Sequence, residues 1–474
     1  MKVIDTIYIN GEFIKPHGTE VADLINPSTN EVIGRLSLGD EIDTRKAVES
    51  ATAAFQLTSK YTKKERSEIL QALGGAVERR TKALIDAMLL EYGATRQFVT
   101  VGMKLSALSF SNYAQVMNDF DFEPTAGKTK VRLEPVGVVG IITPWNSSTG
   151  FICNKLATAI AAGCTAVIKP SEMSGIQTQV LIEALHEAGV PKGIFNFVNG
   201  RGNVVGTEIS RNPGISKISF TGSTVVGKGI IREASETLKR VTLELGGKSP
   251  NIILDDADFT QAIPHAVTLA FNNSGQACIV GSRLLVPENR LEETKKIIKQ
   301  TVEKLRIGDP NKGETDIGPM VSVKQYDRVQ SYIKAGIDEG AELLIGGLGH
   351  PQGLEKGNFV KPTVFVHANN DMKIAREEIF GPVLSVITYK TEEEAIKIAN
   401  DTTYGLAAYV SSSNQERAKK VAARLQAGRV SINKAGHDPL APFGGFKQSG
   451  LGREYGVFGL EEYVESKAIL EEHA

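Results

Sequence analysis

The sequence has few of the residues that build disulfide or metal sites. Of its 474 residues only three are cysteine, seven are histidine and one is tryptophan. Three cysteines cannot form a disulfide framework, and neither a CxxC spacing with histidines nor an HExxH spacing is present. We therefore expect no metal in the functional site, and free thiols at Cys153, Cys164 and Cys278 in a reducing compartment.

A charge excess and long apolar runs are also missing. The 54 basic and 55 acidic residues leave a net charge of -1, which argues against a nucleic-acid or membrane surface. The longest apolar run is about "VGVVGII", far short of the roughly 18 residues of a membrane span. The start, "MKVIDTIYINGEFIKPHG", lacks a signal-peptide apolar region because Asp5, Asn10 and Glu12 interrupt it. These absences predict a cytoplasmic protein without nucleic-acid or membrane partners.

The composition is that of a globular protein, and the order of its apolar patterns predicts an α/β fold. At 474 residues, 41% of them hydrophobic, the chain predicts two or three domains. Residues 62–92 have a helical apolar pattern. From residue 136, continuously apolar runs alternate with helical patterns, which predicts a parallel sheet covered on both faces. A second set of such runs follows Cys278 and predicts a second α/β domain; the two sets are "VGVVGII", "TAVIK", "IFNFV", "ISKISF" and "VTLEL", then "SRLLVP", "TVFVHA", "PVLSVITY", "LAAYVSS" and "GRVSIN".

One segment interrupts the first set. "FDFEPTAGKTKVRLEPVG" alternates charged and apolar residues around Ala126 and Gly127. Such a segment is either a hairpin inserted into the first domain or a loop, and we favour the hairpin.

Polar and glycine-rich motifs follow four of the predicted strands. "PWN" follows "VGVVGIIT", "KPSE" follows "TAVI", "TGSTVVG" follows "ISKISF", and "LGG" follows "RVTLE". Ligands of doubly wound sheets bind beyond the carboxyl ends of the strands. Lys169 and Glu172 of "KPSE" are either a solvated turn or a ribose-binding pair. The four motifs together predict a nucleotide site with a reaction centre beside it.

The glycine patterns differ in how well they predict a phosphate site. "GRGNVVG", with Gly202 and Gly206, is one residue longer than the GxGxxG fingerprint and is a weak signal. "TGSTVVGKGI" is better placed, because it leaves a strand and opens a helix whose N–H groups can bind a phosphate. Ser223 in this segment either caps the helix or contacts the phosphate.

These motifs resemble those of the NAD(P)-dependent aldehyde dehydrogenase superfamily, in its hydrolytic, non-CoA-acylating branch. They span nearly the whole chain in the family's order. The matching segments are "PWN" 144–146, "KPSE" 169–172, "FTGSTVVG" 220–227, "LELGGKSPNII" 243–253, "GQAC" 275–278, "EEIFGPV" 377–383, "NDTTYGLAAYV" 400–410 and "PFGGFKQSGLGRE" 442–454.

The resemblance implies roles for individual residues. Cys278 matches the catalytic nucleophile, Glu244 the general base, and Asn146 the side-chain donor to the oxyanion, which the backbone N–H of Cys278 also contacts. NAD is the implied cofactor, with NADP possible. The positions implied to line the cofactor site are Ile142, Trp145, Lys169, Ser171, Glu172, Gly202, Gly206, Phe220, Gly222, Ser223, Leu245, Glu378 and Phe380.

The resemblance also implies an architecture. It consists of two Rossmann-like parallel-sheet domains and a small element of hairpin and tail that builds a homodimer or homotetramer. The expected NAD(P)-binding domain comprises residues 1–118 and 137–246, and the catalytic domain residues 247–448. The oligomerisation element comprises residues 119–136 and 449–474.

The implied reaction is oxidation of an aldehyde to the carboxylic acid through a thioester on Cys278. One alternative is a CoA-acylating enzyme, but members of that branch generally lack a carboxylate at the Glu244 position. The other is a catalytically silent structural or binding protein on the same fold. No metal is required by the hydrolytic reaction.

The substrate is left open because the chain departs from the family's pattern where relatives bind aldehydes. The departures are "SSTGF" 147–151, Ala277, Ile279 and "AGHDPLA" 435–441. The serines and His437 suggest a polar or small aldehyde. The single tryptophan, Trp145, belongs to the cofactor motif, which disfavours an aromatic cage for a quaternary ammonium group.

Overall fold

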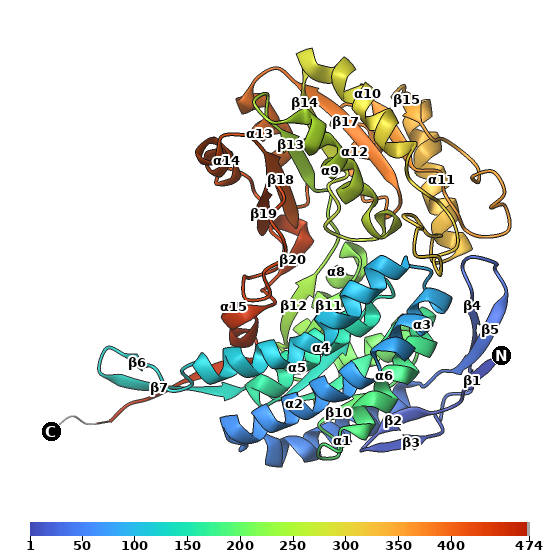
Figure 1. The fold of residues 1–474 in the computed structure, drawn as a ribbon. Coiled ribbons are helices and arrows are strands. Elements are labelled where there is room, and N and C mark those ends of the chain that lie inside the picture. The colour runs from blue at the N-terminus through green and yellow to red at the C-terminus, as the bar shows by residue number, and fades with distance from the viewer. Residues whose placement is uncertain (472–474) are drawn as a thin grey trace.

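The first half of the chain, together with one short strand from near the C-terminus, forms an eight-stranded sheet (Figure 1). The computed structural model describes residues 1–471, and the strand order of this sheet is β20–β12–β11–β8–β9–β10–β2–β3. The five central strands are parallel, as the sequence predicts: β12 (Arg240–Glu244), β11 (Lys217–Thr221), β8 (Val138–Ile142), β9 (Thr165–Lys169) and β10 (Phe195–Phe197). Antiparallel strands complete the edges: β20 (Gly450–Leu451), β2 (Ile7–Ile9) and β3 (Glu12–Ile14).

Helices cover both faces of this sheet. One face packs against α2 (Lys63–Arg79), α3 (Thr81–Glu91), α4 (Arg96–Asp119), α5 (Ser148–Ala162) and α6 (Gly175–Glu187). The other face packs against α1 (Glu41–Thr58), α7 (Thr207–Arg211) and α8 (Thr224–Ser235). The helical pattern of residues 62–92 is two helices, because Arg80 leaves the helical backbone at φ -96° and ψ 5° between α2 and α3.

The second half of the chain forms a seven-stranded sheet above the first (Figure 1). Its order is β15–β16–β17–β14–β13–β18–β19, and only the edge strand β15 is antiparallel. The strands are β13 (Pro250–Ile253), β14 (Arg283–Pro287), β15 (Glu342–Ile345), β16 (Thr363–Val366), β17 (Val383–Tyr389), β18 (Ala407–Ser411) and β19 (Arg429–Ile432). The helices are α9 (Phe259–Phe271), α10 (Leu291–Val302), α11 (Val323–Asp338), α12 (Lys373–Arg376), α13 (Glu392–Asn400) and α14 (Gln415–Ala422).

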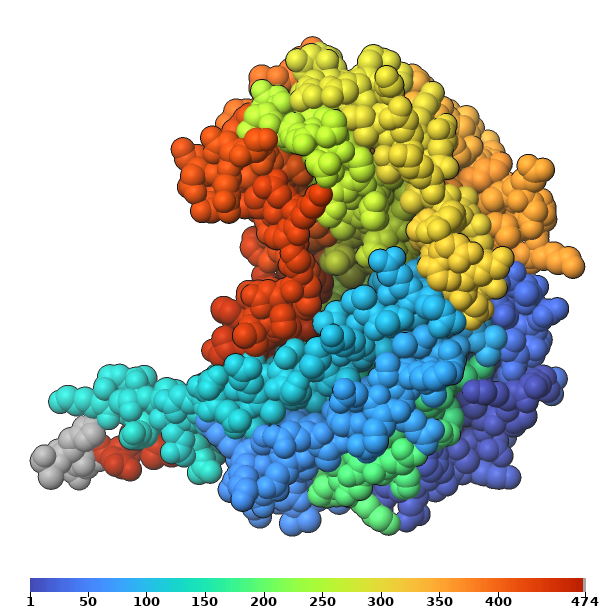
Figure 2. All heavy atoms as spheres, viewed as in Figure 1, coloured from blue at the N-terminus to red at the C-terminus, as the bar shows by residue number. Residues whose placement is uncertain are grey.

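A three-stranded ribbon projects from the body of the molecule (Figure 2). β6 (Thr125–Ala126) and β7 (Thr129–Pro135) pair antiparallel, with Gly127 in the turn at φ 61°, so the inserted segment is a hairpin. β21 (Val464–Ile469), after the short helix α15 (Gly456–Glu461), pairs with β7 along its length. Residues 472–474 of the predicted tail lie outside the described residues.

A small sheet at the N-terminus was not predicted from the sequence. It contains β1 (Lys2–Ile4), β5 (Val32–Ser37) and β4 (Val21–Ile25). β4 alternates exposed and buried side chains along its length, which is the pattern of a strand with one face on the core. Within residues 1–471, no helix combines the length and the apolar character that crossing a bilayer requires.

The parallel register brings the four polar motifs to one edge of the first sheet. Thr221 of β11 lies opposite Glu244 of β12, and the neighbouring Phe220 lies opposite Ile142 of β8. Ile142 in turn lies opposite Lys169 of β9. The segments that follow these strands therefore leave the sheet side by side, at the end where doubly wound sheets bind ligands.

Candidate active site

The loop before Cys278 has a strained backbone. Asn273, Ser274 and Gly275 are left-handed in succession, with φ of 53°, 56° and 73°. Two of the three are not glycine, so the conformation costs free energy that the surroundings must supply. Gly275 cannot be replaced, because a Cβ there would lie 2.2 Å from the carbonyl oxygen of Gly381. This turn directs the chain into the loop that carries Cys278.

Side-chain hydrogen bonds hold this strained loop in place. Asn273 donates from Nδ2 to Tyr92 Oη at 2.5 Å, across to the end of α3. The Ser274 hydroxyl donates to the carbonyl of Gly318 at 3.1 Å and accepts from its N–H at 2.9 Å. The Gln276 amide makes two further main-chain bonds, to Pro319 O at 3.2 Å and from Val321 N at 2.9 Å.

Asn146 follows β8 of the eight-stranded sheet and contacts the loop before Cys278. Its Nδ2 donates to the carbonyl of Gln276 at 3.0 Å, and the residue is 6% exposed. A side-chain amide has two N–H donors, so this bond fixes the amide plane and leaves the second donor for another acceptor. The acceptor, Gln276, lies two residues before Cys278, so the Asn146 amide is held near the place where attack by the thiol would create an oxyanion on the aldehyde oxygen.

Cys278 differs from the other two cysteines in its exposure. Cys153 and Cys164 are fully enclosed, whereas Cys278 is partly exposed. Burial, with the charges of Glu378 and Glu244, raises the pKa of Cys278 to about 12. The thiol is therefore protonated at neutral pH, and a base must take its proton as it attacks an electrophile.

Glu244 is a buried carboxylate without a fixed partner. It is the last residue of β12 and is 3% exposed, and neither carboxylate oxygen has a hydrogen-bond partner among the described residues. Burial raises the pKa of Glu244 well above its usual range, and the charge of Glu454 raises it further. A carboxyl group in this state can accept a proton near neutral pH.

A buried ion pair lies beside Glu244, and sequence reasoning missed it. Lys155 of α5 bonds to Glu454, with both side chains almost fully enclosed. Lys155 Nζ also donates to Ser219 Oγ at 3.0 Å, and Asn154 donates from Nδ2 to Glu454 Oε2 at 3.3 Å. The signal in the sequence was a lysine inside an otherwise apolar helix, "NKLATAIAAG", because a lysine there requires a buried partner.

The residues predicted to bind the adenosine end of a cofactor lie together at the end of β9. Lys169 Nζ lies 3.6 Å from Glu172 Oε2. A Cβ on Gly206 would lie 3.7 Å from Lys169 Cδ, and a Cβ on Gly202 would project into open space. Ser171 accepts a hydrogen bond from the main-chain N–H of the short helical turn that follows it.

The next motif begins a helix, as the sequence predicts. Ser223 is the N-cap of α8, and its hydroxyl accepts from Val226 N at 3.4 Å. Gly222 lies against Phe220, whose ring a Cβ at Gly222 would contact at 2.4 Å. Leu245 packs against α8 at Gly227. Of the two roles considered for Ser223, the capping bond is present.

Trp145, Glu378 and Phe380 meet beside the nucleophile loop. The rings of Trp145 and Phe380 are edge-to-face with centroids 5.4 Å apart, and Tyr92 meets the other side of Trp145 at 5.5 Å. Phe380 is left-handed at φ 63°, and Gln325 Nε2 holds its carbonyl at 2.8 Å. Glu378 accepts from the main-chain N–H of Gly247 at 3.0 Å.

The segment 435–441, in which the chain departs from the family's pattern, is an exposed loop. The ring of His437 meets that of Tyr455 edge-on, with centroids 5.1 Å apart. Tyr455 is left-handed at φ 67°, and its N–H donates to Tyr113 Oη at 3.1 Å. Burial raises the pKa of Tyr455, and the charges of Glu454, Tyr113, Glu244 and Cys278 raise it further.

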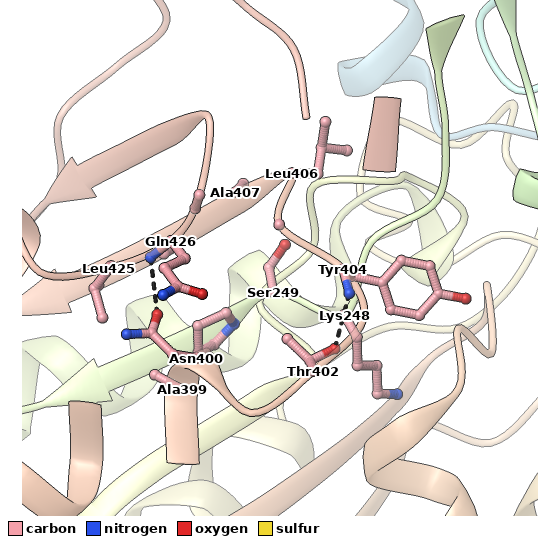
Figure 3. Close-up of a pocket in the computed structure, with 14 residues that line it drawn as sticks. Lys248, Ser249, Ala399, Asn400, Thr402, Tyr404, Leu406, Ala407, Leu425 and Gln426 are labelled. Atoms are coloured by element: carbon pink, nitrogen blue, oxygen red, sulfur yellow. Dashed lines mark hydrogen bonds between the residues drawn. The ribbon is translucent and has the colours of Figure 1, made fainter. Parts of the chain in front are cut away.

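A small pocket lies at the start of β13 and β18 (Figure 3). Its volume is about 10 Å³, the space of a single water molecule. Two of its polar side chains are already bonded: Asn400 Oδ1 accepts from Gln426 N at 2.8 Å, and Thr402 Oγ1 from Tyr404 N at 3.2 Å. The Lys248 amine points away from these groups, and burial lowers its pKa to about 7. This pocket does not admit an aldehyde.

No group of three or more metal-ligating side chains that could hold an ion occurs within residues 1–471. The groups described around Cys278 are a thiol, an amide donor, a carboxyl group without a hydrogen-bond partner among the described residues, and a buried ion pair.

Comparison with known proteins identifies the family. The aldehyde dehydrogenase family model matches residues 13–469. The 3-succinoylsemialdehyde-pyridine dehydrogenase of a Pseudomonas species is 46% identical over 467 residues, which is 98% of each chain.

Two solved structures have the same fold. A cysteine-to-alanine mutant of aldehyde dehydrogenase C from Pseudomonas syringae, complexed with NAD+ and octanal, is 43% identical with a TM-score of 0.97, covering 98% of this chain and 96% of its own. Betaine aldehyde dehydrogenase from Staphylococcus aureus, complexed with NAD+, is 36% identical with a TM-score of 0.95, covering 98% of this chain and 94% of its own. The chain belongs to the aldehyde dehydrogenase family.

Proposed function

We propose that this protein oxidises an aldehyde to the carboxylic acid with NAD, using Cys278 as the nucleophile. The observation that carries the proposal is the grouping around one partly exposed thiol: the Asn146 amide reaches its loop, and the charge of Glu244 acts on its pKa. The free carboxyl of Glu244 supports hydrolysis of the thioester in preference to transfer to a second thiol such as CoA.

The first stage is attack by sulfur on the aldehyde carbon. Cys278 Sγ forms the new C–S bond, its proton passes to a base, and the carbonyl π electrons move to the oxygen. The second N–H of Asn146 and the backbone N–H of Cys278 stabilise that oxyanion, and losing one such donor typically costs about 10²–10³ in rate. When bound, the nicotinamide dinucleotide supplies the two-electron oxidant that accepts hydride.

The second stage is hydrolysis of the Cys278 thioester. Glu244 takes a proton from water, the hydroxide oxygen bonds to the acyl carbon, and the C–S bond breaks to return the thiolate. The proton on Glu244 must then leave before the next turnover. The charges of the buried Lys155–Glu454 pair act on the pKa of Glu244, and this pair is proposed to assist the loss of that proton.

The residues proposed to hold the dinucleotide lie along the sheet edge from β12 to β9, with Trp145, Glu378 and Phe380 beside the nucleophile loop. Two features of the chain fit such a ligand. Gly202 faces open space. The buried hydroxyls of Thr143 and Thr221, at the ends of β8 and β11, have no partner among the described residues and would accept or donate to a polar ligand.

The same proposal assigns a separate role to each part of the chain. Residues 1–118 and 137–246 bind the cofactor, residues 247–448 supply the nucleophile, and residues 119–136 with the tail from 449 build a homodimer or homotetramer in the cytoplasm. Exposed apolar side chains on and after α8 support an interface: Val225 is 80% exposed and Leu238 89%. The projecting ribbon also has an open strand edge that a second copy would cover. A monomer by light scattering would contradict this part.

One experiment tests the proposed reaction. The purified protein is incubated with NAD and a panel of short aliphatic, aromatic, semialdehyde and amino aldehydes, and absorbance of NADH is followed. The expected result is aldehyde-dependent NADH with stoichiometric acid and no requirement for CoA. Turnover that requires CoA, or no turnover with any aldehyde, would contradict the proposal.

A further inference from the structure

The first turn of α6 is capped by a residue of another helix. Ser174, at the N-cap position of α6, makes no capping bond with its own side chain. The carboxylate of Glu91, the last residue of α3, takes its place: Oε1 accepts from Ile176 N at 2.7 Å and Oε2 from Gln177 N at 3.1 Å. These are the N–H groups at the second and third helical positions, which an N-cap side chain normally satisfies.

The contact between α3 and α6 is buried. Glu91 is 2% exposed, and Gln177 is fully enclosed, with its Nε2 also 3.5 Å from Glu91 Oε2. A buried N–H group cannot bond to bulk water instead, so loss of an acceptor oxygen would leave it without a partner. The carboxylate of Glu91 therefore fixes where the first turn of α6 lies.

This turn continues the segment that is proposed to bind the adenosine ribose. Glu172 begins a short helical turn, Glu172–Ser174, that runs directly into Gly175 at the start of α6. Lys169 ends β9 just before it, and its Nζ lies 3.6 Å from Glu172 Oε2. A ligand bound at Glu172 therefore acts on the turn that Glu91 holds.

The two residues after Glu91 contact the catalytic half of the chain. Tyr92 Oη accepts from Asn273 Nδ2 of the nucleophile loop at 2.5 Å. Gly93 is left-handed at φ 76°, and a Cβ there would lie 2.7 Å from Pro319 Cγ, so this part of the chain is tightly enclosed. Consecutive residues at the end of α3 thus hold the first turn of α6 on one side and the nucleophile loop on the other.

We propose that Glu91 is a positioning residue that couples the adenosine end of the dinucleotide site to Cys278. The inference rests on the proposed function, because it takes the ribose to lie at Glu172. A ligand there holds the first turn of α6 against Glu91, the carboxylate holds the end of α3, and Tyr92 then holds the strained nucleophile loop. A ligand that fills the adenosine end alone, without a nicotinamide, should therefore raise the reactivity of the thiol.

Two variants break the coupling at different points. Glu91→Gln keeps the shape of the side chain but replaces one acceptor oxygen with an amide NH2 group, so one N–H of α6 loses its bond. Tyr92→Phe keeps the cap and removes the bond to Asn273. Asp256→Asn is the matched control, because Asp256 is a half-buried carboxylate that also accepts from a main-chain N–H, that of Asn414 at 3.1 Å, beyond the far end of β13.

The measurement is the rate at which iodoacetamide alkylates Cys278, with and without saturating adenosine 5′-monophosphate. Mass spectrometry of the peptide that contains Cys278 gives the rate. The monophosphate has no nicotinamide, so it does not shield the thiol directly. It should raise the rate about fivefold in the wild type and in Asp256→Asn, the lower end of typical coupling between two sites. The increase should be lost in Glu91→Gln and in Tyr92→Phe.

Calorimetry of the monophosphate gives the saturating concentration for each variant. Its Kd should be unchanged in Tyr92→Phe and about three- to tenfold higher in Glu91→Gln, where an N–H of α6 has lost its acceptor. A rate that the bound monophosphate leaves unchanged or lowers in the wild type would overturn the inference. A full increase in either variant would overturn it too, and Tyr92→Phe decides if Glu91→Gln does not fold. If the wild type bound neither the monophosphate nor NAD and oxidised no aldehyde, the proposed function itself would fail.

Discussion

Asn273 and Tyr92 are joined by a buried hydrogen bond of 2.5 Å that connects the nucleophile loop to the end of α3. Asn273 is the first of the three left-handed residues before Cys278, so this bond acts where the strain begins. Tyr92 also contacts Trp145 edge-to-face at 5.5 Å. Tyr92 is thus a positioning residue for Cys278, acting through the loop and not on the substrate.

Tyr92→Phe should slow catalysis by about fivefold while the fold is kept, because one hydrogen bond is worth about 1 kcal/mol and the ring remains. The readout specific to positioning is the rate at which iodoacetamide alkylates Cys278, which should change together with kcat. Tyr389→Phe is the control, since it loses a similar buried bond, from Oη to Ile253 O at 2.8 Å, away from the loop. Equal effects of the two substitutions would show that Tyr92 only stabilises the fold.

Alanine substitution of the three cysteines should affect activity and stability differently. Cys278→Ala should abolish NADH formation because no other exposed thiol is available to attack the aldehyde. Cys153→Ala and Cys164→Ala should retain most of the activity with a lower Tm, because each leaves a small cavity in the core. Turnover and thermal unfolding are measured for each variant. Near-normal turnover of the Cys278 variant would contradict the proposed mechanism.

Glu244→Gln should separate the two half-reactions. Glutamine keeps the shape of the side chain but cannot take a proton from water, so steady-state turnover should fall by about 10² to 10⁴. Mixing with NAD and aldehyde should still give a burst of NADH near one per active site, and intact mass spectrometry should find an acyl group on Cys278. A fall in turnover with neither burst nor adduct would mean that Glu244 acts earlier, on the thiol.

The rate should rise with pH through the neutral range. Glu244 works as a base only when ionised, and its raised pKa moves that ionisation upward; the Cys278 thiol, with pKa about 12, also loses its proton more readily as pH increases. Glu454→Gln removes a negative neighbour and leaves Lys155 unpaired, and both changes lower the pKa of Glu244. The acid limb of the kcat profile should therefore shift to lower pH, even though the protein should be less stable. A shift to higher pH would show that Glu454 does not act on Glu244.

Most of the fold could be predicted because its central strands are continuously apolar and β-branched, which is typical of sheets covered on both faces. The motifs at their ends then fall side by side, since parallel strands share an edge. The partner of Lys155 could not be predicted, because Glu454 lies 299 positions away, just after the tail strand β20. The break at Arg80 was missed as well, because the apolar period continues from α2 into α3.

The N-terminal sheet and the role of Tyr92 could not be predicted from the sequence, for a similar reason. β4 and β5 are short and half-exposed, so their patterns are weak without the packing of α3 and α6 against them. Tyr92 looks like an ordinary aromatic residue at a helix end. The role of Tyr92 is visible only in the structure, where Asn273, 181 positions later in the sequence, donates a hydrogen bond to its hydroxyl.

The pairing of β20 with β12 has a consequence for synthesis on the ribosome. Domains fold from the N-terminus as the chain emerges, and β12 is formed from residues 240–244 long before residues 450–451 are made. Until the tail emerges, β12 is an open edge strand and Lys155 has no carboxylate to meet it. The nascent protein therefore carries Cys278 and Glu244 in an unfinished interior until residues 450–454 emerge and complete it.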